Sequence, residues 1–207
     1  MYVFVWQHGN ESHTGRHING KLNSSGDMES IEVRAPEKSH CFPIHIWSSH
    51  MDRLSVSVKS PTGEVVSGLA AKTGTSLVAK LHQEKSTVEV RYFFPTTGAE
   101  NQLSIVHIFN PTPGIWTIRL HGDVVTDGSY DAWLPVTGHV TEGVEFLAPT
   151  PDRTIVIPAT TVGVICCGAY DFKTNNLQVN SSWGPTRIPT MGITLTAPGE
   201  DVLRCIS

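Results

Sequence analysis

The stretch Gly114-Ile115-Trp116-Thr117-Ile118-Arg119-Leu120 alternates large apolar side chains with polar ones from Trp116 onwards. A period of two places every second side chain of a β-strand on the same face, so one face meets a core and the other meets water. An amphipathic helix would instead repeat its apolar residues every three or four positions. The stretch therefore predicts a half-buried strand.

The same alternation recurs through the middle of the chain, from Ser30 to Leu134. Its other apolar positions are Ile31 and Val33, Ile44 and Ile46, Leu54, Val56 and Val58, Val88, Val90 and Tyr92, and Leu103 and Ile105. Turn-forming runs rich in Pro, Gly, Asn and Asp separate them, at 60–63, 95–98, 110–114 and 126–129. Proline presets φ and glycine permits positive φ in such turns. Short strands between turns predict an antiparallel β-sandwich or jelly roll, in which Leu77–Leu81 is also a strand.

The two ends of the chain have a different pattern. Residues 1–6 and 162–171 form nearly continuous runs of apolar and small residues, as in parallel strands that are buried on both faces. We expect three segments: 1–17 and 151–207 belong to one α/β domain, and 18–150 is a sandwich inserted into it. A chain that begins inside a core strand is expected to be an internal piece of a longer protein. Its open strands should pair with each other, pair with another copy, or pack onto the sandwich.

Composition excludes several classes of partner. The formal net charge of the 207 residues is −4, which lacks the basic footprint of a nucleic-acid-binding protein. No apolar run is long enough for a membrane-spanning helix. The N-terminus lacks the basic region and the cleavage site of a signal peptide. We expect neither a nucleic acid nor a membrane as a partner.

Cysteine and histidine spacing gives no metal signature. The cysteines are Cys41, Cys166, Cys167 and Cys205, without a CxxC pair, and we expect buried free thiols. His8, His13 and His17 are interpreted as a solvated loop rather than a metal site. A calcium site at Asp123, Asp127 and Asp131 is the weaker alternative to ordinary turns. No cofactor is expected.

Four segments resemble motifs of the subtilisin-like serine proteases, in the order found in that family. They are 3–11 with Gly9-Asn10-Glu11, 157–171, Ser181-Ser182-Trp183-Gly184-Pro185, and Ala197-Pro198-Gly199. Within the sandwich, 114–120 and 127–134 resemble a jelly roll that subtilases of the clostridial spore-germination type carry. The resemblance implies a bacterial protein, secreted or spore-associated, with a peptide or protein as substrate.

The resemblance also assigns one role in catalysis. Asn10 corresponds to the oxyanion-hole asparagine, whose amide stabilises the tetrahedral intermediate of acyl transfer. The Asp, His and Ser segments of the catalytic triad would lie outside this chain, so the chain alone should be inactive. The alternative is a non-catalytic sandwich or pseudoprotease scaffold that binds a partner protein, a propeptide or a glycan.

Two further features could be mistaken for functional sites. Gly74-Thr75-Ser76 resembles a nucleophile motif, but it precedes the other motifs, which is the wrong order, and a strand pattern follows it. We interpret it as a turn within the sandwich. Trp116 and Trp133 could form a carbohydrate platform, but aromatic residues in alternating strands are more often part of the core.

Overall fold

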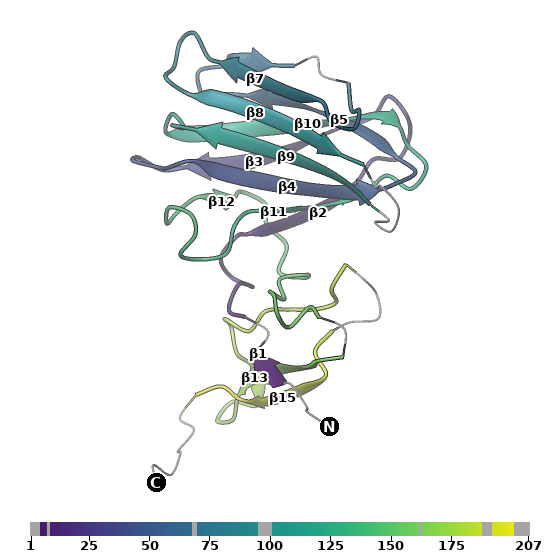
Figure 1. Cartoon of the computed structure of the whole chain (residues 1–207). Helices are drawn as coiled ribbons and strands as arrows, with labels where there is room; N and C mark the ends of the chain where they lie inside the picture. The colour runs from purple at the N-terminus through teal and green to yellow at the C-terminus, as the bar shows by residue number, and fades with distance from the viewer. Residues whose placement is uncertain are drawn as a thin grey trace. The chain divides into compact units, whose positions relative to one another are not determined.

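A computed structural model describes residues 5–7, 9–67, 70–94, 101–161, 163–187 and 192–200. The chain divides into two compact units (Figure 1). One unit, Arg16–Pro149, is called the sandwich below. The other combines Met1–Gly15 with Thr150–Ser207 and is called the end unit. The described residues form strands, turns and loops and no helix, so none of them forms a helix that could cross a membrane.

The sandwich contains two antiparallel sheets, as predicted. One has the order β12 (Glu145–Phe146), β3 (Met28–Ala35), β10 (Gly114–Val124), β5 (Arg53–Lys59) and β6 (Val65–Val66). The other has the order β2 (His17–Lys21), β11 (Ser129–Trp133), β4 (Phe42–Ser49), β9 (Asn101–Phe109), β8 (Thr87–Phe93) and β7 (Ser76–Lys80). The chain crosses between the sheets repeatedly, so that β3 pairs with the distant β10 and β4 with β9.

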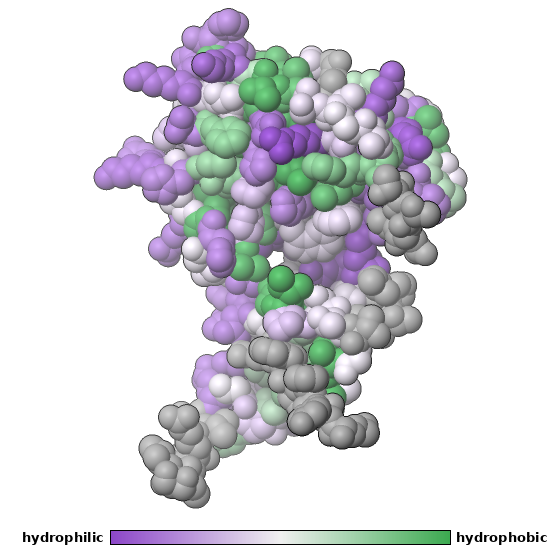
Figure 2. Space-filling view, in the orientation of Figure 1, coloured by the Kyte–Doolittle hydropathy of each residue, from purple (hydrophilic) through white to green (hydrophobic). Residues whose placement is uncertain are grey.

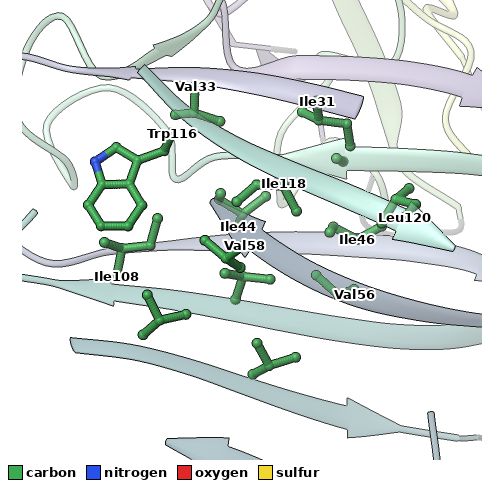
Figure 3. Packing of buried hydrophobic residues seen from close by; sticks show 14 of the residues in the cluster. Ile31, Val33, Ile44, Ile46, Val56, Val58, Ile108, Trp116, Ile118 and Leu120 are labelled. Carbon is green, nitrogen blue, oxygen red and sulfur yellow. The ribbon is translucent and has the colours of Figure 1, made fainter. Parts of the chain in front are cut away.

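The alternating apolar residues form one core between the two sheets (Figure 3). Trp116 is completely buried, and its Nε1 donates a hydrogen bond of 3.0 Å to the Thr112 carbonyl. The indole is thus core, as the alternation predicted, and it does not form a carbohydrate platform. The other side chains labelled in Figure 3 are Ile31, Val33, Ile44, Ile46, Val56, Val58, Ile108, Ile118 and Leu120.

One strand presents the opposite face from the predicted one. Leu103 and Ile105 were expected to point inwards, but both are only half-buried, while Val106 and Ile108 are fully buried. The inward positions earlier in β9 are polar. Gln102 is buried there and its Nε2 donates to the Leu54 carbonyl at 2.9 Å. A period of two shows that side chains alternate between the two faces, but it does not show which set faces the core. In β9 the core-facing set begins with hydrogen-bonded polar residues, so the apolar Leu103 and Ile105 indicated the wrong face.

The end unit contains a small sheet built around β13 (Ile165–Asp171). β1 (Val5–Gln7) and β15 (Leu195–Pro198) both pair with β13 in parallel, and β14 (Asn176–Leu177) pairs with it antiparallel. Val5 lies opposite Ile165. The two ends of the chain therefore pair with each other, as one of the sequence-based expectations proposed.

The predicted subtilisin-like α/β domain is wrong. Parallel strands need a long crossover connection, which in α/β domains is usually a helix. Here the sandwich connects β1 to β13, and the described part of the connection from β13 to β15 contains β14, turns and loops. With no helix among the described residues, the identification of this chain as a piece of a subtilisin-like α/β domain is overturned.

Candidate functional site

The loop that carries Asn10 begins at a glycine whose place no other residue could take without strain. Gly9 has φ of 101°, in the region that L side chains rarely adopt. A Cβ atom at Gly9 would also lie 2.7 Å from Cγ2 of Val156 and 3.2 Å from Oγ of Ser182. Backbone conformation and crowding therefore both require glycine immediately before Asn10.

Ser182 holds the backbone on both sides of Asn10. The Ser182 amide donates to the Gly9 carbonyl at 3.2 Å, and the Glu11 amide donates to Oγ of Ser182 at 3.0 Å. Ser182 is completely buried. These two bonds join the Gly9-Asn10-Glu11 and Ser181-Ser182 segments, which the sequence analysis had linked only through a resemblance.

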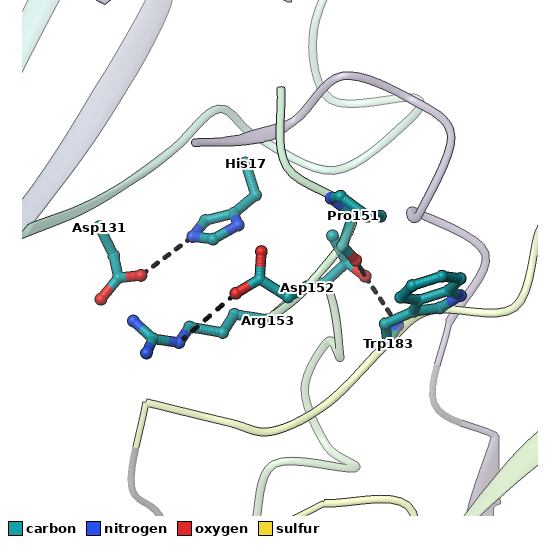
Figure 4. Close-up of polar contacts among 7 residues, drawn as sticks. His17, Asp131, Pro151, Asp152, Arg153 and Trp183 are labelled. Atoms are coloured by element: carbon teal, nitrogen blue, oxygen red, sulfur yellow. Dashed lines mark hydrogen bonds and ion pairs between the residues drawn. The ribbon is translucent and has the colours of Figure 1, made fainter. Parts of the chain in front are cut away.

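Further hydrogen bonds support the two segments from outside. Oγ1 of Thr154 accepts a hydrogen bond from the Trp183 amide at 2.8 Å (Figure 4), and the Thr154 amide donates to the Trp183 carbonyl at 3.0 Å. On the other side, Oγ1 of Thr14 donates to the Glu11 carbonyl at 2.8 Å. The segments around Asn10 are therefore fixed by both side chain–backbone and backbone–backbone hydrogen bonds between loops, rather than by strand pairing.

Asn10 itself is exposed, between the half-buried Gly9 and the buried Glu11. An asparagine side chain offers two N–H donors. Donors fixed before reaction stabilise a developing oxyanion most strongly where water is excluded. The held backbone can supply the fixed position, but water exclusion at an exposed residue would require another surface to cover it.

The predicted histidine loop is only partly observed. His13 is exposed, as expected, and His8 lies outside the described residues. His17 is completely buried in β2, where its Nε2 lies 3.1 Å from Oδ1 of Asp131 (Figure 4) and its ring stacks on Trp133. The prediction of a solvated loop is therefore wrong for His17, because β2 pairs with β11 and places its side chain beside Asp131.

The three aspartates considered for calcium have separate partners. Asp123 accepts a hydrogen bond from Oγ of Ser55, Asp127 accepts from the Ser129 amide, and Asp131 contacts His17. In the described part of the chain, no group of three or more His, Cys, Asp or Glu side chains is arranged to hold a metal ion.

The other residues considered as functional candidates, a serine and the cysteines, have the following positions in the fold. Ser76 begins β7, where it lies opposite Arg91, so Gly74-Thr75-Ser76 is the predicted turn and strand start. Cys166 is buried, and burial, followed by the neighbouring Cys167, raises the pKa of its thiol. Cys41 is exposed and Cys167 is only half-buried, contrary to the prediction of buried thiols, and Cys205 lies outside the described residues.

The roles of Val156 and Thr154 were not predicted from the sequence. Val156 crowds Gly9, and Thr154 bonds to Trp183, but neither stands in a motif of polar or charged residues. A signal was present in the buried pair Ser181-Ser182, because adjacent serines in a buried loop must satisfy their hydroxyl groups.

A solved protease structure resembles this chain. No protein-family model and no protein of curated function matches the sequence. Among solved structures, the chain is similar to the Clostridium perfringens CspB protease, with a TM-score of 0.85 and 27% sequence identity. The match covers 99% of this chain and 43% of the protease chain. The chain is therefore similar to a protease over nearly its whole length and spans less than half of that protease.

Proposed function

We propose that this chain is a module of a serine endopeptidase and that Asn10 supplies an oxyanion-hole donor. The similarity to a solved protease, which extends over both units, is the observation that carries the proposal. The fixed backbone at Gly9 and Glu11 supports the role of Asn10. In this proposal the nucleophile and its base come from outside the 207 residues, and the acyl-enzyme forms there.

The side chain of Asn10 would act on the transition state rather than on the bound substrate. Its amide would donate to the oxygen that becomes negative when the nucleophile attacks the scissile carbonyl. Because Asn10 is exposed here, the part of the protease that carries the nucleophile would also exclude water from the amide. This division of the site predicts that the chain alone has no peptidase activity.

The test compares variants in the full-length protease that contains this chain. Asn10→Ala should lower kcat by about 10²–10³-fold with little change in KM, since the donor acts mainly in the transition state. Asn180→Ala, an exposed asparagine of the same unit, is the matched control. An unchanged kcat for Asn10→Ala would refute the oxyanion role.

Activity of the isolated chain tests the other half of the proposal. The 207-residue chain should neither cleave peptides nor react with a fluorophosphonate probe of activated serines. Labelling that disappears in Ser57→Ala or Ser76→Ala would instead place a nucleophile within the chain and overturn the assignment of the nucleophile to another region.

A further inference from the structure

A pocket of about 490 Å³ lies on the sandwich and reaches one residue of its hydrophobic core, Val56. Strands β5 and β10 contribute Ser55, Val56, Ser57, His121 and Asp123 to its lining, and Ser67 and Ala70 are its other described lining residues. Its volume is within the range of small-molecule sites, about 300–1,000 Å³. Paired strands hold the four polar residues, and His121 lies opposite Ser55 in the register.

Hydrogen bonds between neighbouring strands orient these polar groups. Nε2 of His121 and Oγ of Ser57 lie 2.7 Å apart, and Oγ of Ser55 donates to Oδ1 of Asp123 at 2.9 Å. Each bond uses only part of the capacity of its groups. The serine oxygens retain lone pairs, the second carboxylate oxygen of Asp123 can accept, and the imidazole has a second nitrogen. The pocket therefore offers both donors and acceptors at fixed positions.

The charge of the lining narrows the class of ligand. Among its described residues Asp123 carries the only carboxylate, and no lysine or arginine lines the pocket. An anion would have to approach that carboxylate without a cationic partner. Asp123 is also exposed, so an ion pair with an amine would remain hydrated and contribute little. A neutral ligand whose groups both donate and accept hydrogen bonds meets neither difficulty.

We propose that this pocket binds a neutral polyhydroxylated small molecule, of the saccharide or polyol class. Each hydroxyl group of such a ligand can donate one hydrogen bond and accept two, which complements the serine, imidazole and carboxylate groups of the lining. The proposal is independent of Asn10, because each described lining residue belongs to the sandwich.

Two other interpretations of the same residues are weaker. The Ser57–His121 contact resembles part of a hydrolytic triad, but the structure shows no acid bonded to the second nitrogen of His121 within the described residues. A metal site lacks ligands, since the lining contributes one imidazole and one carboxylate.

The test is an NMR titration of the intact 207-residue chain. Glycerol, glucose and trehalose are added separately, with ethanolamine and inorganic phosphate as charged probes. We expect saturable amide shifts at residues 55–57 and 121–123 with at least one neutral probe and none with phosphate. Absence of saturable shifts with all three neutral probes, or saturation by ethanolamine alone, would overturn the proposal.

Variants locate the binding on the pocket. His121→Ala and Asp123→Ala should each weaken binding of the active probe about tenfold, the effect of losing one well-formed hydrogen bond. Asp123 is exposed, so its substitution should preserve the fold even if His121→Ala does not. Thr117→Ala, on the same strand but outside the lining, is the matched control. Equal affinity in the Asp123→Ala and Thr117→Ala variants would show that binding occurs elsewhere.

Discussion

The sandwich and the end unit differ most in how much apolar surface each buries. The sandwich core includes fully buried aromatic side chains from both sheets, among them Trp116, Phe42 and Tyr92. In the end unit, the described buried cluster consists of Ile155, Ala159 and Cys166, with Ile193 partly buried against it. The same unit leaves Ile157 81% and Val179 77% exposed.

This contrast indicates that the larger core and the candidate catalytic residue lie in different units. Small units bury a low fraction of their surface and rarely stabilise themselves through one core. The sandwich has a core that can support folding, whereas Asn10 stands in the unit with the smaller described core. On the face of the sandwich shown in Figure 2, hydrophobic side chains are dispersed among hydrophilic ones. We therefore expect core substitutions in the sandwich to have the largest effects.

Trp116→Ala should destabilise the sandwich by about 3–5 kcal/mol, because it removes a completely buried indole and leaves a cavity. The measurement is urea denaturation followed by circular dichroism. Thr117→Ala, the next residue on the opposite face of β10, should change stability by less than about 0.5 kcal/mol. Similar losses in the two variants would contradict the division of β10 into a core face and an outer face.

Asp52→Ala should cost about 2–3 kcal/mol in the sandwich. The buried Asp52 carboxylate accepts hydrogen bonds from the amides of Thr126 at 2.7 Å, Asp127 at 3.0 Å and Gly128 at 2.9 Å. Removing it leaves three amides without these acceptors, one of them buried. Hydrogen exchange should be accelerated by the substitution more at the amides of 126–128 than at those of β4 or β9. Unchanged protection of 126–128 would show that Asp52 does not hold this turn.

Tyr92 should make the sandwich sensitive to alkaline pH. Burial raises the pKa of Tyr92 to about 12, while its hydroxyl oxygen accepts a hydrogen bond of 2.8 Å from the Val56 amide. Because the folded pKa lies above the unfolded value, this contribution to stability is complete below about pH 10 and is lost as pH rises towards 12. Tyr92→Phe should flatten the fall in urea midpoint over that range. A fall as steep as that of the unmodified chain would rule out Tyr92 as its source.

Ile157→Ser should have the smallest effect on stability, below about 0.5 kcal/mol, because the side chain is 81% exposed. If the end unit associates with another copy of the chain, as we propose from its exposed apolar residues, the substitution should weaken that association. Sedimentation velocity at several concentrations measures it. Val78→Ser, at an exposed position of the sandwich, is the control. Equal sedimentation of both variants and the unmodified chain would contradict association through Ile157.

The alternation of apolar and polar residues predicted the sandwich, but it identified the core-facing residues of some strands and not of others. The alternation in β3, β4, β5, β8 and β10 identified the core residues directly, because each of those strands has one apolar face. It failed at β9, where buried Gln102 and Ser104 share the core face with Val106 and Ile108. Polar residues can occupy such positions when the opposite sheet supplies partners, as Leu54 does for Gln102.

The surroundings of Asn10 were less predictable than the strands. The sequence placed Asn10 after a strand and beside a glycine, but it did not show that Ser182 would bond to both neighbouring residues. Contacts between distant segments depend on the fold of everything between them, so local pattern does not report them. The α/β prediction failed for a related reason, since apolar runs show burial and do not show whether a helix connects the strands.

The hydrogen bond from Glu11 to Ser182 closes a loop across 171 positions of sequence. Contacts of such separation form late unless the intervening chain is already compact, because closing a loop costs entropy that increases with its length. Within the sandwich, the Arg16 guanidinium bonds to the Val144 carbonyl, so the folded sandwich brings its first residue close to its last strand. Folding of the sandwich therefore brings the Asn10 loop and Ser182 closer together along the chain's path. We expect the contact between Glu11 and Ser182 to form no faster than the sandwich folds.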